Sequence, residues 1–368
     1  MDIAIVSTQG AQLRQARIRA KATSKYLANE SALILNPEQK EQIRSVWGDI
    51  HIDKRWIAYY NQFRQDGAPW SACYVPANLQ YGVLDMFYTD YRKCRVMEDK
   101  NWNQLLFDDI RQPHTILRHV KNLKSCSSVF LDENYRLIDR SQALRILSSV
   151  GDVICKPSIE SGGGRNIAFL DRNQAPEKRL AAIDGMPNAI VQEIVGQHPS
   201  LSSLNTMSLN TTRYVTFITK DGDVRLLSAI VRMGANNSRV DNACAGGMFC
   251  GVSDTGQMRA KGFNLKGECY TMHPDSKIGF DGYMIPSYAT CRQLVLSLAP
   301  RLYNVSRLVS WDMAISEDGE PVLIEANMTY GGCNIPQMAN GPLYGDLTGD
   351  VIKEVFATKL NRLYAWLI

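Results

Sequence analysis

The sequence predicts an α+β fold that is divided into lobes, and three observations lead to this fold class. At 368 residues the chain is too long for one small hydrophobic core. From Leu13 to about Val96 it is rich in Gln, Lys, Arg, Tyr and Trp at helix-like spacing, as in Ile43, Val46 and Trp47. Further along, apolar stretches flank an Asp-Gly pair twice, which is typical of β-hairpins. We therefore expect a mainly helical N-terminal lobe followed by mixed α and β structure.

Charge and cysteine content exclude several classes of protein. The net charge of +4, from 41 basic and 37 acidic residues, is too balanced to indicate a nucleic-acid partner. The first residues lack a basic region followed by a long apolar core, and no apolar run approaches the ~20 residues that span a bilayer. The nine cysteines include no CxxC pair, so neither a disulfide framework nor a zinc site is indicated. We expect a cytoplasmic protein with no membrane span.

A change of character near residue 97 predicts a domain boundary. Asp99 and Lys100 open a helix that extends to about residue 106, and a proline at position 113 follows it. The other expected elements are a capped helix at 141–147, strands at 151–157 and 189–195, hairpins at 213–219 with 224–233 and at 309–315 with 321–327, and an amphipathic terminal helix at 351–368.

The last hairpin gathers three oxygen donors. A two-residue turn at Asp318-Gly319 would set Asp312 opposite Glu325, with Asn327 on the same face. Two carboxylates and an amide suit a hard cation such as Mg²⁺, although a solvated polar face is an equal alternative. The apolar side chains assigned to the opposite face are Trp311, Met313, Ile315, Val322 and Ile324.

A lysine on a strand precedes a glycine-rich loop. Lys156 lies in the predicted strand 151–157, and Ser161 and Gly162, Gly163 and Gly164 follow it. Glycines allow close backbone approach, so their N–H groups could hold phosphate oxygens while the lysine supplies positive charge. The GxxxxGK[ST] order of a Walker loop is absent, and a simple hairpin loop is the alternative interpretation.

Two further segments contain residues that could bind parts of a nucleotide or a phosphoryl group. Gln192, Glu193, Ile194 and Val195 form a strand end in which residues 193–195 could hold adenine through their backbone, with a plain strand end as the alternative. In the hairpin about Asp221-Gly222, two arginines share a face with Val215 and Phe217. These arginines, Arg213 and Arg232, could bind a transferring phosphoryl group or form surface ion pairs. The polar loop that follows, from residue 236 to 247, suits an anionic substrate.

Taken in order along the chain, these signals resemble the ATP-grasp superfamily over roughly residues 97–345. The segment Asn210-Thr-Thr-Arg-Tyr-Val-Thr and the helical N-terminal lobe look most like the sugar-transfer-associated ATP-grasp proteins. The resemblance implies an ATP-grasp fold in which two α/β lobes, at 97–195 and 196–368, clasp ATP beside the helical lobe at 1–96.

The resemblance also implies a role for each site residue. Lys100, Lys156, Ser161 and Gly162 to Gly164 would contact the ATP phosphates, and Gln192 to Val195 would hold adenine. Asp312, Glu325 and Asn327 would bind two Mg²⁺ ions, with Mn²⁺ as the alternative metal. Arg213 and Arg232 would steady the transferring group, and Asn242 would approach the substrate. His198, where many relatives carry a ribose-binding acid, could reach a hydroxyl or be structural. Asp312 also departs from the family pattern, because a glutamate is common there.

The implied activity is that of an ATP-dependent ligase. A carboxylate would attack the γ-phosphate of ATP, and an amine would trap the acyl phosphate to form an amide or peptide-like bond. The expected substrates are small sugar- or amino-acid-derived carboxylates and amines in polysaccharide or natural-product tailoring, and a homodimer is one assembly that this organisation allows. The alternatives are a kinase-like phosphotransferase on the same fold and a non-catalytic nucleotide-binding module.

Overall fold

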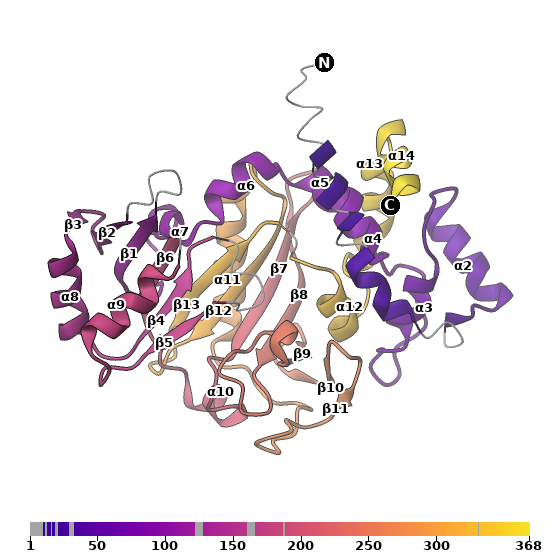
Figure 1. Ribbon diagram of the computed structural model, residues 1–368. Coiled ribbons are helices and arrows are strands. Elements are labelled where there is room, and N and C mark those ends of the chain that lie inside the picture. The colour runs from indigo at the N-terminus through magenta and orange to yellow at the C-terminus, as the bar shows by residue number, and fades with distance from the viewer. Residues whose placement is uncertain are drawn as a thin grey trace.

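The computed structural model describes residues 10–11, 13–15, 17–18, 21–28, 33–121, 128–159, 166–186, 188–329 and 331–368. Ser161 and Gly162 to Gly164, the predicted phosphate loop, lie outside the described residues. Figure 1 shows a small sheet at one end, a larger sheet in the middle and the helical N-terminal lobe at the other end. In the ranges that are described, no helix is long and apolar enough to cross a membrane.

The smaller sheet is antiparallel, with the strand order β3-β2-β1-β6-β4-β5. Its strands are β1 (Thr115–Lys121), β2 (Ser128–Asp132), β3 (Leu137–Ile138), β4 (Val153–Pro157), β5 (Ala168–Leu170) and β6 (Asn188–Glu193). Two helices, α8 (Arg140–Ser149) and α9 (Pro176–Asp184), cover one face through a core that includes Leu117, Leu147 and Leu180. Asp139 begins α8 with a capping box. The helix predicted at 141–147 and the strands predicted at 151–157 and 189–195 are confirmed by α8, β4 and β6.

The larger sheet has the order β11-β10-β9-β8-β7-β12-β13. Its strands are β7 (Thr211–Ile218), β8 (Val224–Met233), β9 (Met248–Val252), β10 (Met258–Asn264), β11 (Cys269–Tyr270), β12 (Leu308–Ile315) and β13 (Pro321–Asn327). The helix α11 (Tyr288–Leu298) packs on one face against Trp311 and Val231. Short helical segments complete this part of the chain: α10 (Pro199–Leu204), η4 (Ala243–Ala245) and η5 (Ala299–Leu302).

The N-terminal lobe is helical, as predicted, but its core is shared with the end of the chain. Its elements are η1 (Ser24–Leu27), α2 (Pro37–Trp47), α3 (Arg55–Asn61), α4 (Ala77–Leu79), η3 (Gln80–Leu84), α5 (Asp85–Tyr88) and α6 (Tyr91–Met97), and α7 (Lys100–Leu106) follows it. Trp56 and Tyr60 lie in one apolar cluster with Val355 and with Phe249 of the larger sheet. The helices near the C-terminus are α12 (Asn334–Asn340), η6 (Gly345–Leu347), α13 (Thr348–Val355) and α14 (Lys359–Leu367).

The prediction of a single terminal helix at 351–368 is wrong, because the chain forms two helices there, α13 and α14. Thr358 interrupts the helical pattern and caps α14 by accepting a hydrogen bond from the backbone N–H of Asn361 at 3.3 Å. A β-branched hydroxyl residue favours such a cap over a helix interior.

The last hairpin reaches the predicted register by a different route. Its loop has three residues rather than two, because the Ser316 N–H donates to the Glu320 carbonyl oxygen at 3.0 Å, and Gly319 adopts φ +84°. Past the loop, Met313 pairs with Leu323 but Asp312 pairs with Glu325, so one extra residue forms a β-bulge on β13. The bulge restores the pairing of the two carboxylate residues.

The hairpin of β7 and β8 is built in the same way. The Thr219 N–H donates to the Asp223 carbonyl oxygen at 2.9 Å, which again leaves a three-residue loop ending in glycine. The register then shifts between Val215 and Thr216, so that Arg213 pairs with Ile230. Each hairpin therefore combines a longer loop with a compensating bulge.

The bulge also changes which apolar side chains enter the core. The assignment of Val322 and Ile324 to the face of Trp311 is wrong. Leu323 pairs with Met313 and packs with Trp311 instead, while Ile324 lines the cavity described below. The reason is that one inserted residue inverts the alternation of side chains along the strand.

Candidate functional site

A large cavity of about 2060 Å³ lies between the two sheets and the N-terminal lobe. Most of the predicted site residues line it, although they come from eight different segments of the chain. They are Lys100, Lys156, Gln192, Glu193, Ile194, Val195, Arg213, Arg232, Asn242, Asp312, Glu325 and Asn327.

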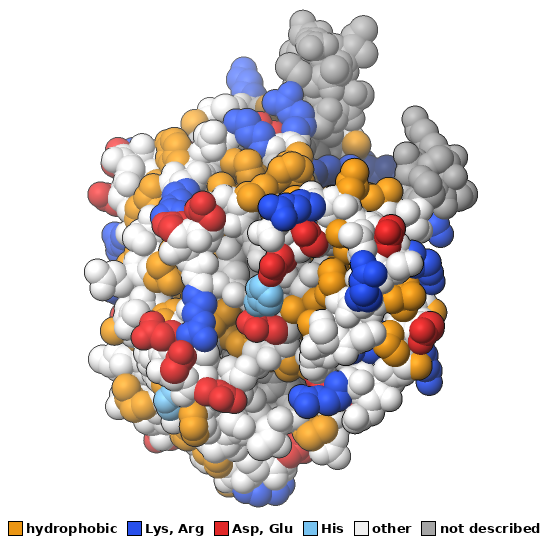
Figure 2. Space-filling view, turned by 90° about the vertical axis from the view of Figure 1, so that its left-hand side faces the viewer, with side chains coloured by type: hydrophobic (Ala, Val, Ile, Leu, Met, Phe, Trp, Pro, Cys, Tyr) orange, Lys and Arg blue, Asp and Glu red, His pale blue; other side chains and the backbone are white. Residues whose placement is uncertain are grey.

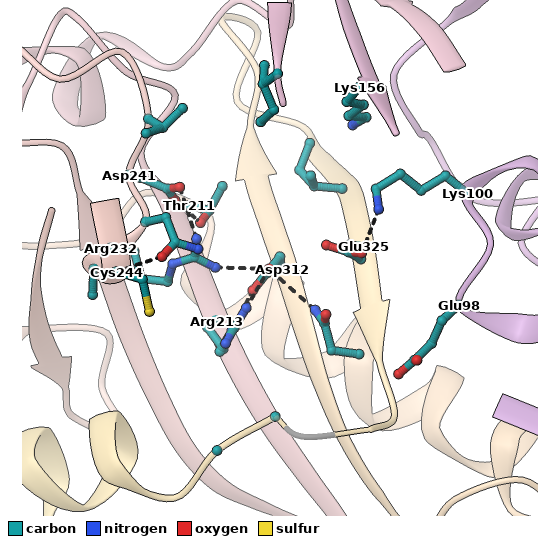
Figure 3. A pocket seen from close by; sticks show the side chains of 18 of the residues that line it. Glu98, Lys100, Lys156, Thr211, Arg213, Arg232, Asp241, Cys244, Asp312 and Glu325 are labelled. Carbon is teal, nitrogen blue, oxygen red and sulfur yellow. Dashed lines mark hydrogen bonds and ion pairs between the residues drawn. The ribbon is translucent and has the colours of Figure 1, made fainter. Parts of the chain in front are cut away.

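Asp312 is the centre of a buried ion-pair network (Figure 3). Arg213 donates to it twice, from Nε to Oδ1 at 2.7 Å and from Nη2 to Oδ2 at 2.8 Å, and Arg232 donates from Nη1 to Oδ2 at 2.9 Å. Burial alone would raise the pKa of Asp312, but the charges of the two arginines outweigh it and hold this pKa well below its usual range. The carboxylate is therefore ionised and keeps both guanidinium groups at fixed positions.

Asp241 extends this network, and sequence reasoning missed it. The Nη2 atom of Arg232 lies 3.0 Å from its Oδ1 atom, and the hydroxyl of Thr211 donates to its other oxygen. Burial would lower the pKa of Arg232, but Asp241 and Asp312 raise it above the ordinary value. Asp241 lies in the polar loop 236–247, so the available signal was an acid in a loop already expected to face a substrate.

A second set of charges faces the network across the cavity. Lys100, at the start of α7, places Nζ 2.9 Å from Oε1 of Glu325. Lys156 on β4 is buried beside them, and Figure 3 shows the two lysines on the same side of the cavity. Burial, followed by the charge of Lys100, lowers the pKa of Lys156 to about 8, although Glu325 opposes the shift. An anion placed here would meet two lysines that are already close together.

The cavity residues fall within a region that a known protein family matches. The family described as sugar-transfer associated ATP-grasp matches residues 83–348. This chain belongs to that family. The predicted α+β ATP-grasp fold is thereby confirmed. A search of curated proteins found no match to the sequence.

Several solved structures are similar to this chain at low identity. The ATP-grasp ligase PsnB complexed with minimal precursor is 14% identical over 73% of this chain and 64% of its own, with a TM-score of 0.40. D-alanyl-alanine synthetase A from Vibrio cholerae is 14% identical over 71% and 66%, with a TM-score of 0.38. Biotin carboxylase from Campylobacter jejuni is 8% identical over 76% and 47%, with a TM-score of 0.40. The chain thus spans 64% of the length of that PsnB chain, and the family assignment rests on the family match.

ATP-grasp enzymes use ATP with a divalent metal, and part of the predicted donor set fits such an ion. Glu325 and Asn327 stand two residues apart on β13 and both line the cavity. The Nδ2 atom of Asn327 points to the Ser310 carbonyl and to Asp312 Oδ2, each at 3.4 Å, which leaves its Oδ1 atom as a potential ligand. Asp312 pairs with the two arginines, yet among the described residues only the Arg213 Nε–H donates to its Oδ1 atom, which leaves that atom a second lone pair. Over the described ranges, no three His, Cys, Asp or Glu side chains form a metal cluster by themselves.

Glu98 is a second carboxylate that the sequence did not reveal. It accepts hydrogen bonds from the backbone N–H groups of Met328 at 2.9 Å and Thr329 at 2.6 Å, and from the Thr329 hydroxyl. Burial raises the pKa of Glu98, although the hydrogen bonds from Thr329 lower it. Glu98, in the turn between α6 and α7, therefore ties that turn to the segment directly after Asn327 and so helps to position that amide.

The strand end predicted to hold adenine forms one wall of the cavity. Gln192 is held by hydrogen bonds from Nε2 to the Pro113 carbonyl at 3.3 Å and to the Thr115 hydroxyl at 3.2 Å. The carboxylate of Glu193 accepts from the backbone N–H of His114 at 3.0 Å. Both side chains thus brace the wall, whose apolar part also includes Ile154, Phe169 and Ile324.

The side chain of His198 forms a hydrogen bond with the backbone and does not line the cavity. It caps α10, where its Nδ1 atom accepts the Ser200 N–H at 3.2 Å, and it is not among the residues that line the cavity. An acidic residue that does lie beside Gly196 is Glu317, from the loop of the last hairpin. It lines the cavity, and a Cβ atom built on Gly196 would lie 2.5 Å from its Oε1 atom.

The loop 236–247 crosses toward the smaller sheet. The guanidinium of Arg239 lies 3.8 Å from the ring centroid of Phe169 on β5. Asn242 lines the cavity and caps η4 by accepting the Cys244 N–H at 2.8 Å. The loop therefore borders the cavity between the two sheets, beside the arginine network.

Proposed function

We propose that this protein is an ATP-dependent ligase that joins a carboxylate to an amine through an acyl phosphate. The carboxylate oxygen attacks the γ-phosphorus and ADP leaves; the amine nitrogen then attacks the acyl carbon and phosphate leaves. The substrates are sugar- or amino-acid-derived and belong to polysaccharide or natural-product tailoring. A cytoplasmic location, a homodimer and the boundaries near residues 97 and 195 stay predictions.

The observation that supports this proposal is the arrangement of four cations around one cavity. Arg213 and Arg232 are held on Asp312, while Lys100 and Lys156 lie together across the cavity. A transferring phosphoryl group carries negative charge on its oxygens, and fixed cations stabilise that charge without rearrangement during the reaction. Two lysines suit the phosphates of ATP, and two planar guanidinium groups suit the phosphoryl group and the substrate carboxylate.

We assign the other groups by their positions. Ile154, Phe169 and Ile324 supply apolar surface for the nucleobase beside Ile194 and Val195. Glu325 and Asn327, with the remaining lone pair of Asp312, would hold Mg²⁺, which supplies charge neutralisation when it is bound. Asn242 would approach the substrate from its loop, and the glycine loop 162–164 would contact the phosphates.

A purified-enzyme assay tests the proposal. Phosphate release from ATP is measured with panels of carboxylates and amines, supplied separately and together. We expect release to require both co-substrates and a divalent metal. Phosphorylation of a single hydroxyl compound would instead identify a kinase-like phosphotransferase.

One substitution and one matched control test the metal assignment. Glu325→Gln should lower phosphate release at least about 100-fold, since it removes a charged ligand of the Mg²⁺ that would neutralise the reacting phosphates. Glu320→Gln, an exposed position in the same hairpin, should leave the rate unchanged. ATP binding by calorimetry should persist in both variants, and full activity of Glu325→Gln would overturn the assignment.

A further inference from the structure

Two basic and apolar segments meet at one end of the molecule. The guanidinium of Arg17 donates from Nε to the carbonyl oxygen of Leu367 at 2.9 Å, which joins the N-terminal segment to the end of α14. Figure 1 shows α14 on the side of the molecule away from the smaller sheet. Neither segment contributes to the ion-pair network around Asp312.

The outward side of α14 is apolar. Leu363 is 54% exposed and Trp366 is 67% exposed, and Leu360 and Leu367 are also exposed. The ring of His51 stacks on one face of Trp366, with the ring centroids 4.0 Å apart, and most of the tryptophan stays in contact with water. The opposite side of the helix packs inward through Ala365. Exposed leucine and tryptophan at helical spacing leave a continuous apolar stripe in water, which is unfavourable unless another surface covers it.

The two segments that meet here are basic in sequence, and Arg17 is in contact with the end of α14. From position 10 to 29 the sequence contains five Lys or Arg residues and no acidic residue, and from 356 to 368 it contains two and again no acidic residue. Arg17, Lys21 and Lys25 are exposed, as is Lys359. Arg362 is paired with the exposed Asp49 at 2.8 Å, so we do not count its charge. By contrast, Figure 2 shows acidic and basic side chains interspersed over the face at the other end.

We infer that this end of the molecule, formed by α14 and the described residues between 10 and 27, binds the surface of an anionic lipid bilayer. A helix with Leu and Trp on one side and basic residues beside them is the pattern of an interfacial helix, which inserts its apolar side among the lipid headgroups. Anionic lipids attract each nearby Lys or Arg, so the net positive charge complements that surface. The inference is independent of the proposed function.

A bilayer bound at this end of the molecule would lie near the cavity. Arg14, Gln15 and Ile18 line the cavity, and Arg17 in the same segment holds α14. A bilayer against α14 would therefore lie beside the part of the cavity that the N-terminal segment borders.

Co-sedimentation of the full chain with lipid vesicles tests the inference. The probes are vesicles of phosphatidylcholine with equal parts phosphatidylglycerol, and vesicles of phosphatidylcholine alone. We expect binding to the anionic vesicles and a blue shift of tryptophan emission that Trp366→Phe abolishes. Lys21→Gln with Lys25→Gln should weaken binding about 30-fold, because each basic residue near such a surface contributes about fivefold.

Apolar variants and matched controls complete the experiment. Leu363→Ser with Trp366→Ser should weaken binding at least about tenfold, since two side chains no longer enter the headgroup region. Leu137→Ser and Lys178→Gln, which are exposed on β3 and α9 in the distant sheet, should bind like the wild type. Circular dichroism checks that each variant is folded.

Three results would overturn the inference. They are absence of binding to anionic vesicles, equal binding to both vesicle types, and unchanged binding of the α14 variants. If the protein does not bind vesicles but forms a dimer, and the α14 variants dissociate this dimer, then a second copy of the chain covers the stripe instead.

Discussion

Raising the pH from 7 to 9 should weaken ATP binding because Lys156 loses its proton. Burial and the neighbouring charge of Lys100 lower the pKa of Lys156 to about 8, below that of an ordinary lysine. The free protein then carries this charge in about nine-tenths of molecules at pH 7 and in about one-tenth at pH 9. If ATP binds the charged form, the apparent dissociation constant rises about tenfold between these two values.

Calorimetry measures this effect in two independent ways. The affinity for ATP is determined at pH 7, 8 and 9, and the heat in buffers of different ionisation enthalpy gives the protons taken up on binding. Near pH 8 about half a proton should be taken up, because half of the molecules must acquire one.

A matched substitution assigns the effect to this side chain. Lys156→Arg keeps its charge over the whole range and should bind ATP with little dependence on pH. The exposed control Lys178→Arg should behave like the wild type. A wild-type affinity that is flat from pH 7 to 9, or an undiminished pH dependence in Lys156→Arg, would show that the protonation of Lys156 does not control ATP binding.

The same pKa shift has a definite sign for stability. The folded pKa of about 8 lies below the unfolded value, so the unfolded chain binds the extra proton between about pH 8 and 10.5. Lys156 therefore destabilises the folded protein fully below pH 8. This destabilisation disappears as the pH rises through that window.

Three further changes test the packing around the site by urea denaturation. Asp312→Asn should lower the free energy of unfolding by about 3–5 kcal/mol, because the half-buried Arg213 loses its counter-charge and the buried Arg232 keeps only Asp241. An unchanged midpoint would contradict the network. Thr216→Val should cost about 1–3 kcal/mol, since the buried Trp311 Nε1–H donates to the Thr216 hydroxyl at 2.8 Å and would lose its acceptor. Gly319→Ala should cost about 1 kcal/mol through its φ of +84° alone. Gly349→Ala, in a helix with open space around it, should not destabilise the protein, and equal losses at the two glycines would argue against a backbone cause.

Local signals in the sequence anticipated the elements well. Asp139 and Gln142 form the capping box that begins α8, and Asp99 caps α7 by accepting the Asn101 N–H. The hairpins appear at their predicted positions because alternation and turn residues act over a few neighbouring positions. The loop lengths and bulges did not follow from the same signals, since the twist and packing of the whole sheet decide where an extra residue is accommodated.

The partners of the charged residues were harder to anticipate. The sequence grouped Asp312 with Glu325 as metal ligands, but the structure pairs Asp312 with two arginines and Glu325 with Lys100. Such pairing depends on which strands and helices become neighbours and on how deeply each charge is buried, and neither quantity is local.

By itself, the sequence determined the mixed fold, the two glycine-ended hairpins and the order of charged residues that marks the ATP-grasp family. The tertiary structure alone decided that Asp241, Glu98 and Glu317 join the site from loops. It also decided that Ile324 faces the cavity and that α14 leaves an apolar stripe outside. The physical reason is that short-range backbone preferences specify elements, whereas contacts between distant segments arise from burial and charge pairing once those elements pack.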